Sequence, residues 1–282
     1  MKNGIVILNY NDYVNTSLIL DNIKDFAVLD YIIIVDNNST DESVKVLKKY
    51  ENKKIKLLIN KENKGYAYGN NVGVKYLINK CKVDNIIISN PDIIVKEDVI
   101  KKLLQDLKKK DVAIVAPVIV EPEDVSRGWK LPTFKSELLS NLPYFNYLAN
   151  ELLEYDEHYY DDEFSAVDVV KGCFFIVKAN VFKKIGFFDE HTFLFYEEVI
   201  IAKKLYDLGY KTLVDNSVSV YHASSITINK NLKRMKKFKI LKDSQKYFVK
   251  QVMKFNSFQI FLIRFCYYFN YIISYIYSLL MS

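Results

Sequence analysis

The chain has 282 residues and a net charge of +6, and half of its residues are hydrophobic. With 8 Gly and 5 Pro it is neither collagen-like nor dominated by linkers, and its length fits one α/β domain with or without an extension. The charge is uneven, because residues 230–282 hold 11 Lys or Arg and one acid, Asp243, which leaves residues 1–229 at −4. This distribution argues against nucleic-acid binding by the whole domain and indicates a localised anionic partner or a solvated basic helix.

The three cysteines, Cys81, Cys173 and Cys266, lie far apart and show no metal-binding spacing. We therefore expect reduced thiols in a cytoplasmic protein. The apolar run 5–8 near the N-terminus is too short for a signal peptide and predicts a buried first strand.

The first half of the chain alternates strand and helix patterns. Because the strands are continuously apolar, this alternation predicts an α/β fold with a mostly parallel sheet covered on both faces. Ser39 and Glu42 have the spacing of a capping box and predict a helix start. The expected strands are 5–9, 31–35, 56–59, 85–89 and 112–120, and the expected helices are 14–26, 39–50, 66–79 and 97–109.

The second half is less regular. Residues 121–166 contain three prolines, the single Trp and many acids and aromatics, which predicts a long, partly ordered excursion beside the sheet. A strand at 167–177, a helix at 197–208 and a last strand at 212–221 follow. Residues 230–282 read as a helical extension, so the predicted domains are 1–229 and 230–282.

Polar clusters follow three of the predicted strands, at residues 9–11, 36–38 and 90–92. One such cluster is more typical of a turn, because Asn, Asp and Pro favour turns. Three clusters at the carboxyl edge of one sheet favour a ligand site, since open α/β sheets bind ligands there. The chain has no GxGxxG after the first strand, no GxxxxGK[ST] and no GxSxG, so dinucleotide, P-loop and serine-hydrolase sites are not supported.

Five segments stand out in order along the chain: VILNYN (6–11), VDNNSTDES (35–43), NKGYAYGNNVG (63–73), SNPDI (89–93) and GCFFIVKANVFKKIGFFDEHTFLFYEEV (172–199), and YHASS (221–225) fits a sixth. Together they resemble the family 2 glycosyltransferases of GT-A fold, especially their bacterial rhamnosyltransferase-like branch. The resemblance covers about residues 4–225 and implies a GT-A fold for residues 1–229. It further implies an inverting enzyme that transfers a sugar, with rhamnose a candidate, from a pyrimidine nucleotide diphosphate donor to a glycan or lipid-linked acceptor in surface polysaccharide synthesis.

The resemblance also implies a divalent cation, Mn²⁺ or Mg²⁺, that neutralises the leaving diphosphate. Asp92 matches the last position of the family's DxD-like motif, and His222 matches a histidine that resembles the second protein ligand. A hard cation prefers oxygen ligands, which suits Asp92. For His222 the alternative is a solvent-capped strand end.

The remaining site residues are carried over in the same way. Glu198 matches the general base that accepts the acceptor's proton, with Glu197 next, although acids are also common in a first helical turn. Asp36 is expected to face the base or ribose, while Gly65 lets the backbone approach the ligand. The expected nucleotide-binding residues are Asn9, Asp36, Asn38, Gly65, Asn71 and Asn90.

The C-terminal extension is basic and then aromatic, with ten Phe or Tyr in residues 255–281. This order is typical of attachment to an anionic membrane surface and predicts a peripheral protein on the inner face of the cell membrane. The alternative is a helical hairpin that packs on the domain or on a second subunit in a homo-oligomer.

Two other functions stay open on the sequence alone. A sugar-nucleotide nucleotidyltransferase uses a related sheet but needs a Gly-rich, basic N-terminal loop, which residues 5–13 lack. A non-catalytic nucleotide-sugar-binding subunit is compatible with Asn90 and Ile200, which stand where the family often has acids.

Overall fold

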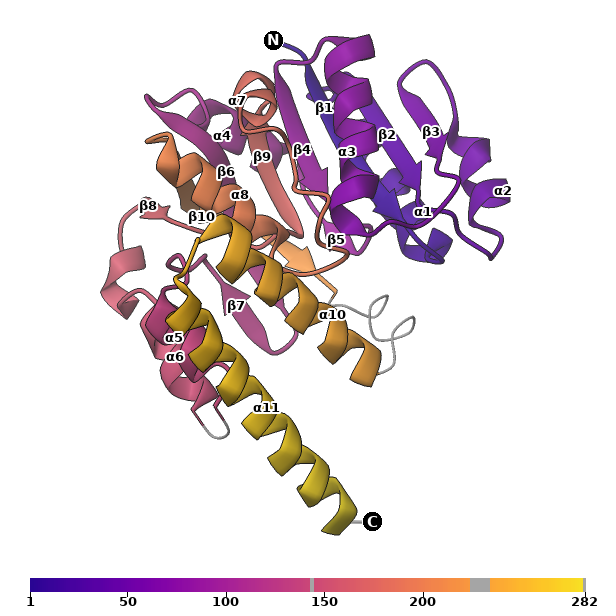
Figure 1. Ribbon diagram of the computed structural model, residues 1–282. Coiled ribbons are helices and arrows are strands. Elements are labelled where there is room, and N and C mark those ends of the chain that lie inside the picture. Colours follow the sequence, from indigo (N-terminus) through magenta and orange to yellow (C-terminus); the bar gives the residue numbers. More distant parts are fainter. Residues whose placement is uncertain (143–144, 224–233, 281–282) are drawn as a thin grey trace.

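One mixed sheet of ten strands forms the centre of the computed structural model, which describes residues 1–142, 145–223 and 234–280. The strands follow the order β3-β2-β1-β4-β9-β6-β10-β5, while β7 pairs with β6 and β8 with β10. Figure 1 shows this sheet with helices on both of its faces. The strands are β1 (Asn3–Asn9), β2 (Tyr31–Asp36), β3 (Ile55–Ile59), β4 (Asn85–Ser89), β5 (Ile93–Ile94), β6 (Val112–Glu121), β7 (Asp124–Ser126), β8 (Phe164–Val167), β9 (Phe174–Lys178) and β10 (Lys211–His222).

The direction of the strands decides where their ends meet. β1 is parallel to β2 and β4, and β6 is parallel to β10, as the alternating pattern predicts. β9 is antiparallel to both β4 and β6, between which it lies, so the sheet is mixed in its middle. As a result the carboxyl ends of β1, β2, β4, β6 and β10 share one edge with the start of β9.

Helices cover both faces of the sheet and give it two cores. One core joins the sheet to α1 and α4, through Ile19, Leu20 and Leu103 among others, and the other joins it to α3, α7 and α8, through Val74, Phe182 and Leu205 among others. The helices of the body are α1 (Tyr13–Ile23), α2 (Ser43–Leu47), α3 (Tyr66–Tyr76), α4 (Glu97–Asp106), α5 (Phe134–Leu139), α6 (Asn146–Leu153), α7 (Ala179–Lys184) and α8 (Glu197–Asp207).

Two predicted details are wrong. The capping box at Ser39 does not form: α2 begins at Ser43, and Ser39 Oγ instead accepts hydrogen bonds from the Asn11 backbone and the Asn9 amide at 2.9 and 3.1 Å. The strand predicted at 167–177 is two strands, β8 and β9, which pair with different neighbours.

The excursion predicted at 121–166 holds short elements in its described residues, namely β7, α5, α6 and the start of β8. Its aromatic and apolar side chains pack on the body.

The C-terminal helices α10 (Arg234–Tyr247) and α11 (Ser257–Leu280) are separated by a π-helical turn at Phe248–Val252. That turn packs on the body, where Phe248 and Val249 are buried in one cluster with Val199 and Ile200 of α8. α11 then runs away from the body towards the C-terminus (Figure 1). Among the described residues, none of the helices combines the length and the apolar character needed to cross a membrane.

Candidate active site

The predicted site residues converge on the edge where the parallel strands end. Asn9 ends β1, Asp36 ends β2 and His222 ends β10, while Asp92 lies in the turn after β4. The sheet register pairs Asn9 directly with Asp36, and it pairs His222 with Ile93, next to Asp92. Residues distant in sequence are therefore neighbours here because the strands that carry them are paired.

Asn9 and Asp36 form a buried polar pair with no exposed surface. The Asn9 amide donates to Asp36 Oδ2 at 2.8 Å, and the Ser39 backbone N–H donates to Oδ1 at 2.9 Å. The hydroxyl of Thr16 donates to the other end of the Asn9 amide at 2.8 Å. These contacts fix the turn after β2 and hold the Asp36 carboxylate at the sheet edge.

Asn38 and Asn90 lie in the turns after β2 and β4. Asn38 is exposed and left-handed, with φ of 66°, a backbone region that Asn tolerates better than most residues. The backbone N–H of Asn90 donates to the Cys173 carbonyl at 2.8 Å, which ties its turn to the loop before β9. The side chain of Asn90 is partly exposed at the sheet edge.

Gly65 precedes α3 with φ of 101°. A Cβ atom at this position would lie 2.1 Å from the backbone oxygen of Phe193, so no other residue fits without moving that loop. The next residue, Tyr66, donates its N–H to the same oxygen at 2.9 Å and its hydroxyl to the Gly172 carbonyl at 2.8 Å. Gly65 therefore allows a close approach between two segments of the protein, at a position predicted to approach the nucleotide.

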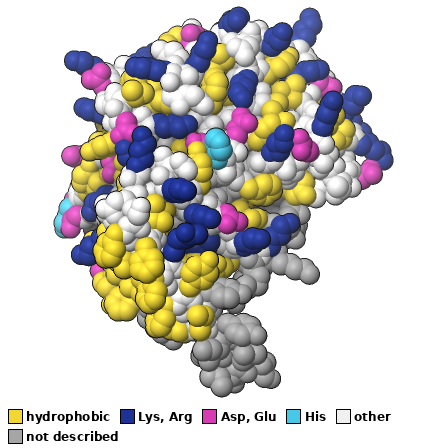
Figure 2. Space-filling model, in the orientation of Figure 1, with side chains coloured by type: hydrophobic (Ala, Val, Ile, Leu, Met, Phe, Trp, Pro, Cys, Tyr) yellow, Lys and Arg dark blue, Asp and Glu magenta, His cyan; other side chains and the backbone are white. Residues whose placement is uncertain are grey.

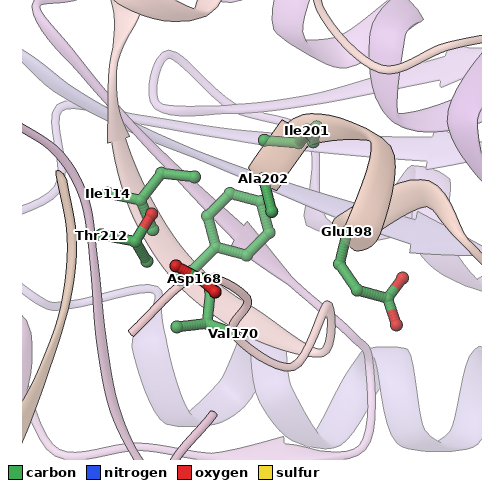
Figure 3. Close-up of a pocket in the computed structure, with 8 residues that line it drawn as sticks. Ile114, Asp168, Val170, Glu198, Ile201, Ala202 and Thr212 are labelled. Atoms are coloured by element: carbon green, nitrogen blue, oxygen red, sulfur yellow. The ribbon is translucent and has the colours of Figure 1, made fainter. Parts of the chain in front are cut away.

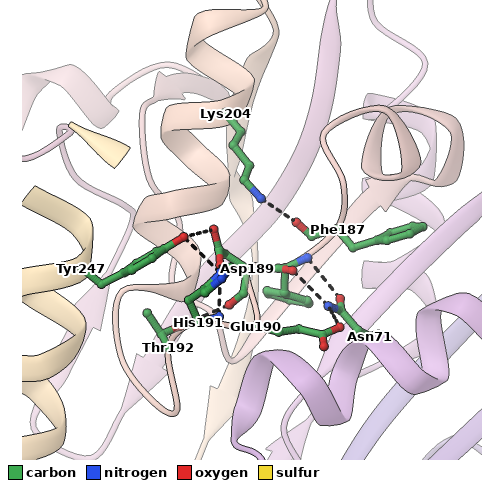
Figure 4. Close-up of polar contacts among 9 residues, drawn as sticks. Asn71, Phe187, Asp189, Glu190, His191, Thr192, Lys204 and Tyr247 are labelled. Atoms are coloured by element: carbon green, nitrogen blue, oxygen red, sulfur yellow. Dashed lines mark hydrogen bonds and ion pairs between the residues drawn. The ribbon is translucent and has the colours of Figure 1, made fainter. Parts of the chain in front are cut away.

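Asn71 is buried on α3 and bonds to the loop that follows α7 (Figure 4). Its amide nitrogen donates to the Phe188 carbonyl and to Glu190 at 3.0 and 2.7 Å, and its oxygen accepts the Phe188 N–H at 3.1 Å. Both amide protons are thus used within the protein, and the observed contacts hold the segment 188–190 against α3.

Asp92 and His222 face one another beneath the surface, with Oδ1 of Asp92 and Nε2 of His222 3.1 Å apart. Nδ1 of His222 lies 2.5 Å from Oε1 of Glu121, the last residue of β6, and Oε2 of Glu121 lies 2.5 Å from Nζ of Lys171. Although burial opposes it, the carboxylates of Asp92 and Glu121 raise the pKa of His222. The contact with Glu121 assigns the ring proton to Nδ1 in the neutral imidazole and turns the lone pair of Nε2 towards Asp92.

This arrangement fits a divalent cation. Oδ1 of Asp92 and Nε2 of His222 are both buried, have no hydrogen-bond partner apart from their contact with each other, and are close enough to share an ion. A carboxylate on the far ring nitrogen is the usual partner of a metal-binding histidine. Across the described residues, no group of three or more His, Cys, Asp or Glu side chains is arranged to hold a metal by itself. The remaining ligands would then come from the substrate, as is usual where a cation binds phosphates.

Glu197 and Glu198 open α8, after two non-glycine residues with left-handed backbones, Phe195 and Tyr196 (φ 73° and 70°). Glu197 is buried, and its Oε1 has no hydrogen-bond partner. Burial and the charge of Glu198 raise the pKa of Glu197 to about 8. Burial also raises the pKa of Glu198, against the opposing charge of Lys171.

Glu198 also lies at the rim of a small cavity of about 10 Å³ between α8 and the sheet. Figure 3 shows its carboxylate directed away from Asp168 and Val170, which line the same cavity. The space suffices for about one water molecule, so this cavity is not a sugar site. The Glu198 carboxylate also lies close to Gly172: a Cβ atom placed on Gly172 would be 3.7 Å from Oε2 of Glu198.

Sequence reasoning missed several residues that the fold brings to this edge. Glu121 could have been found, because it is an acid at the end of a predicted strand, the same signal that marked Asp36. Lys171 and Tyr66 lie inside or beside matched segments but carry no motif signal of their own. Nothing in the sequence connects Glu137 of α5 with Tyr196, whose hydroxyl lies 3.0 Å from Oε2 of Glu137.

The amino-acid sequence matches one family of known proteins and two individual relatives. The family model described as "Glycosyl transferase family 2" matches residues 5–186. The chain is 24% identical over 197 residues to the low-salt glycan biosynthesis hexosyltransferase Agl10 of Haloferax volcanii. The aligned residues make up 70% of this chain and 59% of Agl10. It is also 24% identical over 219 residues to the dTDP-rhamnosyl transferase RfbF of Shigella flexneri, with 77% and 68% covered. The chain thus spans about three fifths of the length of Agl10.

Solved structures with the same fold include GalNAc-T7 with UDP, GalNAc and Mn²⁺, at a TM-score of 0.63 and 16% identity, over 79% of this chain and 44% of that one. The mannosyltransferase PcManGT from Pyrobaculum calidifontis, in complex with GDP-Man and Mn²⁺, gives a TM-score of 0.57 at 13% identity, over 94% and 73%. At these identities the likeness concerns the fold, which is of the GT-A type.

Proposed function

Because the chain belongs to glycosyl transferase family 2, we propose that it transfers a hexosyl residue from a nucleoside diphosphate sugar to a glycan or lipid-linked acceptor. The observation that carries this proposal is the meeting of three features at one sheet edge. These are the Asn9–Asp36 pair, the Asp92–His222 pair and the two acids that open α8. A nucleotide, a cation and a base are the three parts that metal-assisted sugar transfer needs.

The donor end of the site begins at Asp36. Its two oxygens each accept one internal hydrogen bond, so each keeps a lone pair for the imide N–H of a pyrimidine base, but the residue has no exposed surface and its cover must open for the base to enter. Asn9 holds the carboxylate in place, and Asn38 and Asn90 border the same edge from the adjoining turns. We include Gly65 and Asn71 as residues that shape the pocket by holding the loops at 193 and 188–190. A dTDP- or UDP-linked sugar suits this pocket, with rhamnose a candidate because RfbF is a weak relative.

Asp92 and His222 would hold Mn²⁺ or Mg²⁺, with Glu121 orienting the histidine. When bound, the cation neutralises the charge that develops on the leaving diphosphate. Two structural relatives were solved with Mn²⁺, which supports the choice of metal. Asn90 in place of an acid leaves Asp92 as the carboxylate of this turn, so the protein's own metal affinity is modest.

Glu198 is the proposed general base, and Glu197 its neighbour. Burial and the charge of Glu198 raise the pKa of Glu197 to about 8, so the proton stays on Glu197 at neutral pH. Glu198 is the better placed to be ionised, since Lys171 offsets the effect of burial on its pKa. An ionised Glu198 accepts the proton of the acceptor hydroxyl as that oxygen attacks the sugar from the face opposite the diphosphate, which inverts the anomeric centre.

A surface that could bind a lipid-linked acceptor lies on α11. α11 exposes a continuous aromatic face, while Ile263 and Cys266 on its inner side are buried. Figure 2 shows hydrophobic side chains gathered over α5, α6 and the described part of α11, next to basic side chains over α10. The exposed face consists of Phe258, Phe261, Phe265, Tyr268, Phe269 and Ile272, and we call it the α11 stripe.

We assign the α11 stripe to an anionic lipid surface. Lys236, Lys239, Lys246, Lys250 and Lys254 are exposed beside it, and a basic border around an apolar face matches an anionic headgroup layer. Attachment there would bring a lipid-linked acceptor to the enzyme and place the protein at the inner face of the cell membrane. A second copy of the chain on the same stripe is the competing occupant.

The proposal is tested by incubating the protein with UDP-, dTDP- and GDP-linked sugars, with Mn²⁺, Mg²⁺ or EDTA, and measuring release of the nucleoside diphosphate. We expect metal-dependent release with a pyrimidine donor, and a rise in Tm with that donor, because a ligand of the folded state stabilises it. Binding without any release or transfer, with all candidate acceptors, would instead indicate a non-catalytic binding subunit. Release of pyrophosphate from a nucleoside triphosphate would indicate a nucleotidyltransferase.

A further inference from the structure

The segment that delivers Glu197 and Glu198 is held by the C-terminal helix α10. Ser244 Oγ donates to the Leu194 carbonyl at 2.8 Å, and the hydroxyl of Tyr247 donates to Asp189 Oδ2 at 3.0 Å. The Tyr247 ring also stacks on His191, with ring centroids 5.0 Å apart (Figure 4). Residues of α10 therefore contact both ends of the segment 189–194 and hold it in place.

A buried hydrogen-bond network connects α10 with Tyr196, the residue before Glu197 and Glu198. Gln245 donates from Nε2 to Glu137 Oε2 at 2.5 Å, and Tyr196 donates its hydroxyl to the same oxygen at 3.0 Å. Gln245 and Glu137 are 4% and 3% exposed, so water does not compete for these bonds. Phe248, with no exposed surface, packs on the Tyr196 ring at 5.1 Å.

The backbone at this point needs such support. Phe195 and Tyr196 both have positive φ, a backbone region that is strained for a residue with a side chain. Two such residues in succession persist when surrounding contacts fix them, and strain of this kind collects at functional sites. The contacts that fix Tyr196 come from Glu137 of α5, which Gln245 of α10 holds, and from Phe248 of the π-helical turn after α10, all far from Tyr196 in sequence.

We propose that Glu137 and Gln245 are positioning residues that act through Tyr196 to orient Glu197 and Glu198, so that α10 is part of the active site. The inference rests on the proposed function, since it concerns the geometry of the catalytic acids. In this proposal the role of α10 in positioning the two acids is independent of the contacts that α11 makes. A displacement of about 1 Å in a reacting group can cost about 100-fold in rate, so small errors at Tyr196 are sufficient for a measurable effect.

The test compares Gln245→Leu and Tyr196→Phe with Asp243→Ala, an exposed neighbour on the same helix. We expect kcat to fall about 10-fold or more in the first two variants, while the KM for the donor and the Kd for the nucleoside diphosphate stay within about 2-fold. Asp243→Ala should keep the wild-type kcat. Tyr196→Phe removes a single hydroxyl, so it decides the matter if Gln245→Leu does not fold.

Exchanging the two side chains, Glu137 and Gln245, tests whether the lost kcat can be restored. Glu137→Gln alone removes the negative charge and one of the two acceptor oxygens that face Gln245 and Tyr196, whereas Glu137→Gln with Gln245→Glu returns a carboxylate to the pair in the reverse sense. We expect the double variant to recover most of the kcat that Glu137→Gln loses. The single Trp of the chain, Trp129, packs in the same cluster as Tyr196 and Tyr247, so its fluorescence reports whether that packing is intact in each variant.

The outcomes separate the two proposals. A wild-type protein that transfers no sugar would overturn the proposed function itself. An active wild type whose Tyr196→Phe and Gln245→Leu variants keep its kcat would overturn the positioning role alone. The same holds if the variants lose kcat only in proportion to the unfolded fraction, or if the exchange restores Tm without restoring kcat.

Discussion

Nε2 of His222 lies 3.1 Å from Oδ1 of Asp92, and neither buried atom has a partner other than this contact. Without a proton on Nε2 the contact satisfies neither atom, and each unsatisfied buried polar atom costs on the order of 1–3 kcal/mol. The far ring nitrogen, by contrast, is bonded to Glu121 at 2.5 Å. A histidine that is fixed on one side and open on the other is arranged to bind a ligand with its open nitrogen, which supports the metal site proposed above.

The first prediction concerns this metal pair. Asp92→Ala should abolish binding of Mn²⁺ in the presence of the nucleoside diphosphate, because it removes the carboxylate ligand. Glu121→Ala should weaken Mn²⁺ binding by about 10–100-fold, the usual effect of losing the residue that orients a histidine ligand. Titration calorimetry measures both. Glu123→Gln, an exposed acid two residues away, is the matched control, and an unchanged Mn²⁺ affinity in Glu121→Ala would remove His222 from the metal site.

The second prediction concerns the base. Glu198→Gln keeps the shape of the side chain but cannot accept a proton, so transfer should fall by about 10²–10⁴-fold. Donor binding, measured by calorimetry, should stay close to that of the wild type. If Glu197→Gln is the inactive variant and Glu198→Gln is active, the roles of the two acids are reversed.

Much of this site could be predicted, because the parallel strands bring their carboxyl ends to one edge. Asn9, Asp36 and Asp92 all end strand patterns that the sequence marks clearly. The antiparallel β9 could not be predicted, since a buried strand reads the same in either direction. The contacts of Ser244 with Leu194 and of Phe248 with Tyr196 were equally hidden, because they depend on tertiary packing between segments about 50 residues apart, for which a single sequence carries no local signal.

The C-terminal extension shows the same limit. Its basic and aromatic composition predicted a surface-binding segment, and its helices are confirmed for the described residues. The composition did not distinguish α10, which packs on the body, from α11, whose outer face is exposed. The difference lies in a few residues such as Phe248 and Val249, which are buried against α8.

The third prediction concerns stability and pH. Between about pH 5 and pH 8 the unfolded chain ionises Glu197, whereas the folded chain keeps its proton because its pKa is raised to about 8. The unfolded state then binds fewer protons, so Glu197 makes stability fall as the pH rises through this window. Glu197→Gln removes that dependence and should raise Tm at pH 8 by about 5 °C. Thermal unfolding at pH 5 and pH 8 checks this, and an equal Tm difference at both pH values would contradict it.

The fourth prediction concerns the nucleotide. Asp36→Ala should weaken binding of uridine or thymidine diphosphate by about 10–100-fold, the range expected for a lost hydrogen bond to a charged group. The effect should be similar with and without Mn²⁺, because the contact is to the base. Asp25→Ala, an exposed acid, serves as control, and a melting curve of Asp36→Ala shows whether the turn it holds survives. An unchanged Kd in a folded variant would exclude Asp36 from the pocket.

The last prediction concerns the α11 stripe. Phe261, Phe265 and Phe269 follow one another at four-residue spacing, with neighbouring rings 6.4 and 6.5 Å apart. Replacing all three with Ser should abolish flotation with anionic vesicles, because each buried aromatic side chain contributes roughly 1.5–3 kcal/mol. The fold should survive, since 61%, 59% and 49% of these side chains are exposed. Leu18→Ser, on α1 and 64% exposed, is the control for loss of a surface apolar residue.

Salt separates the two contributions to this binding. The lysines of α10 act through charge, which 1 M salt screens to a Debye length of about 3 Å, whereas apolar burial is not screened. High salt should therefore weaken vesicle binding of the wild type without abolishing it, and neutral vesicles should bind less than anionic ones. If the stripe instead joins two copies of the chain, light scattering will show a dimer that the triple Ser variant dissociates, and the wild type will not float with vesicles. That pair of results would replace the membrane assignment with a homo-oligomer.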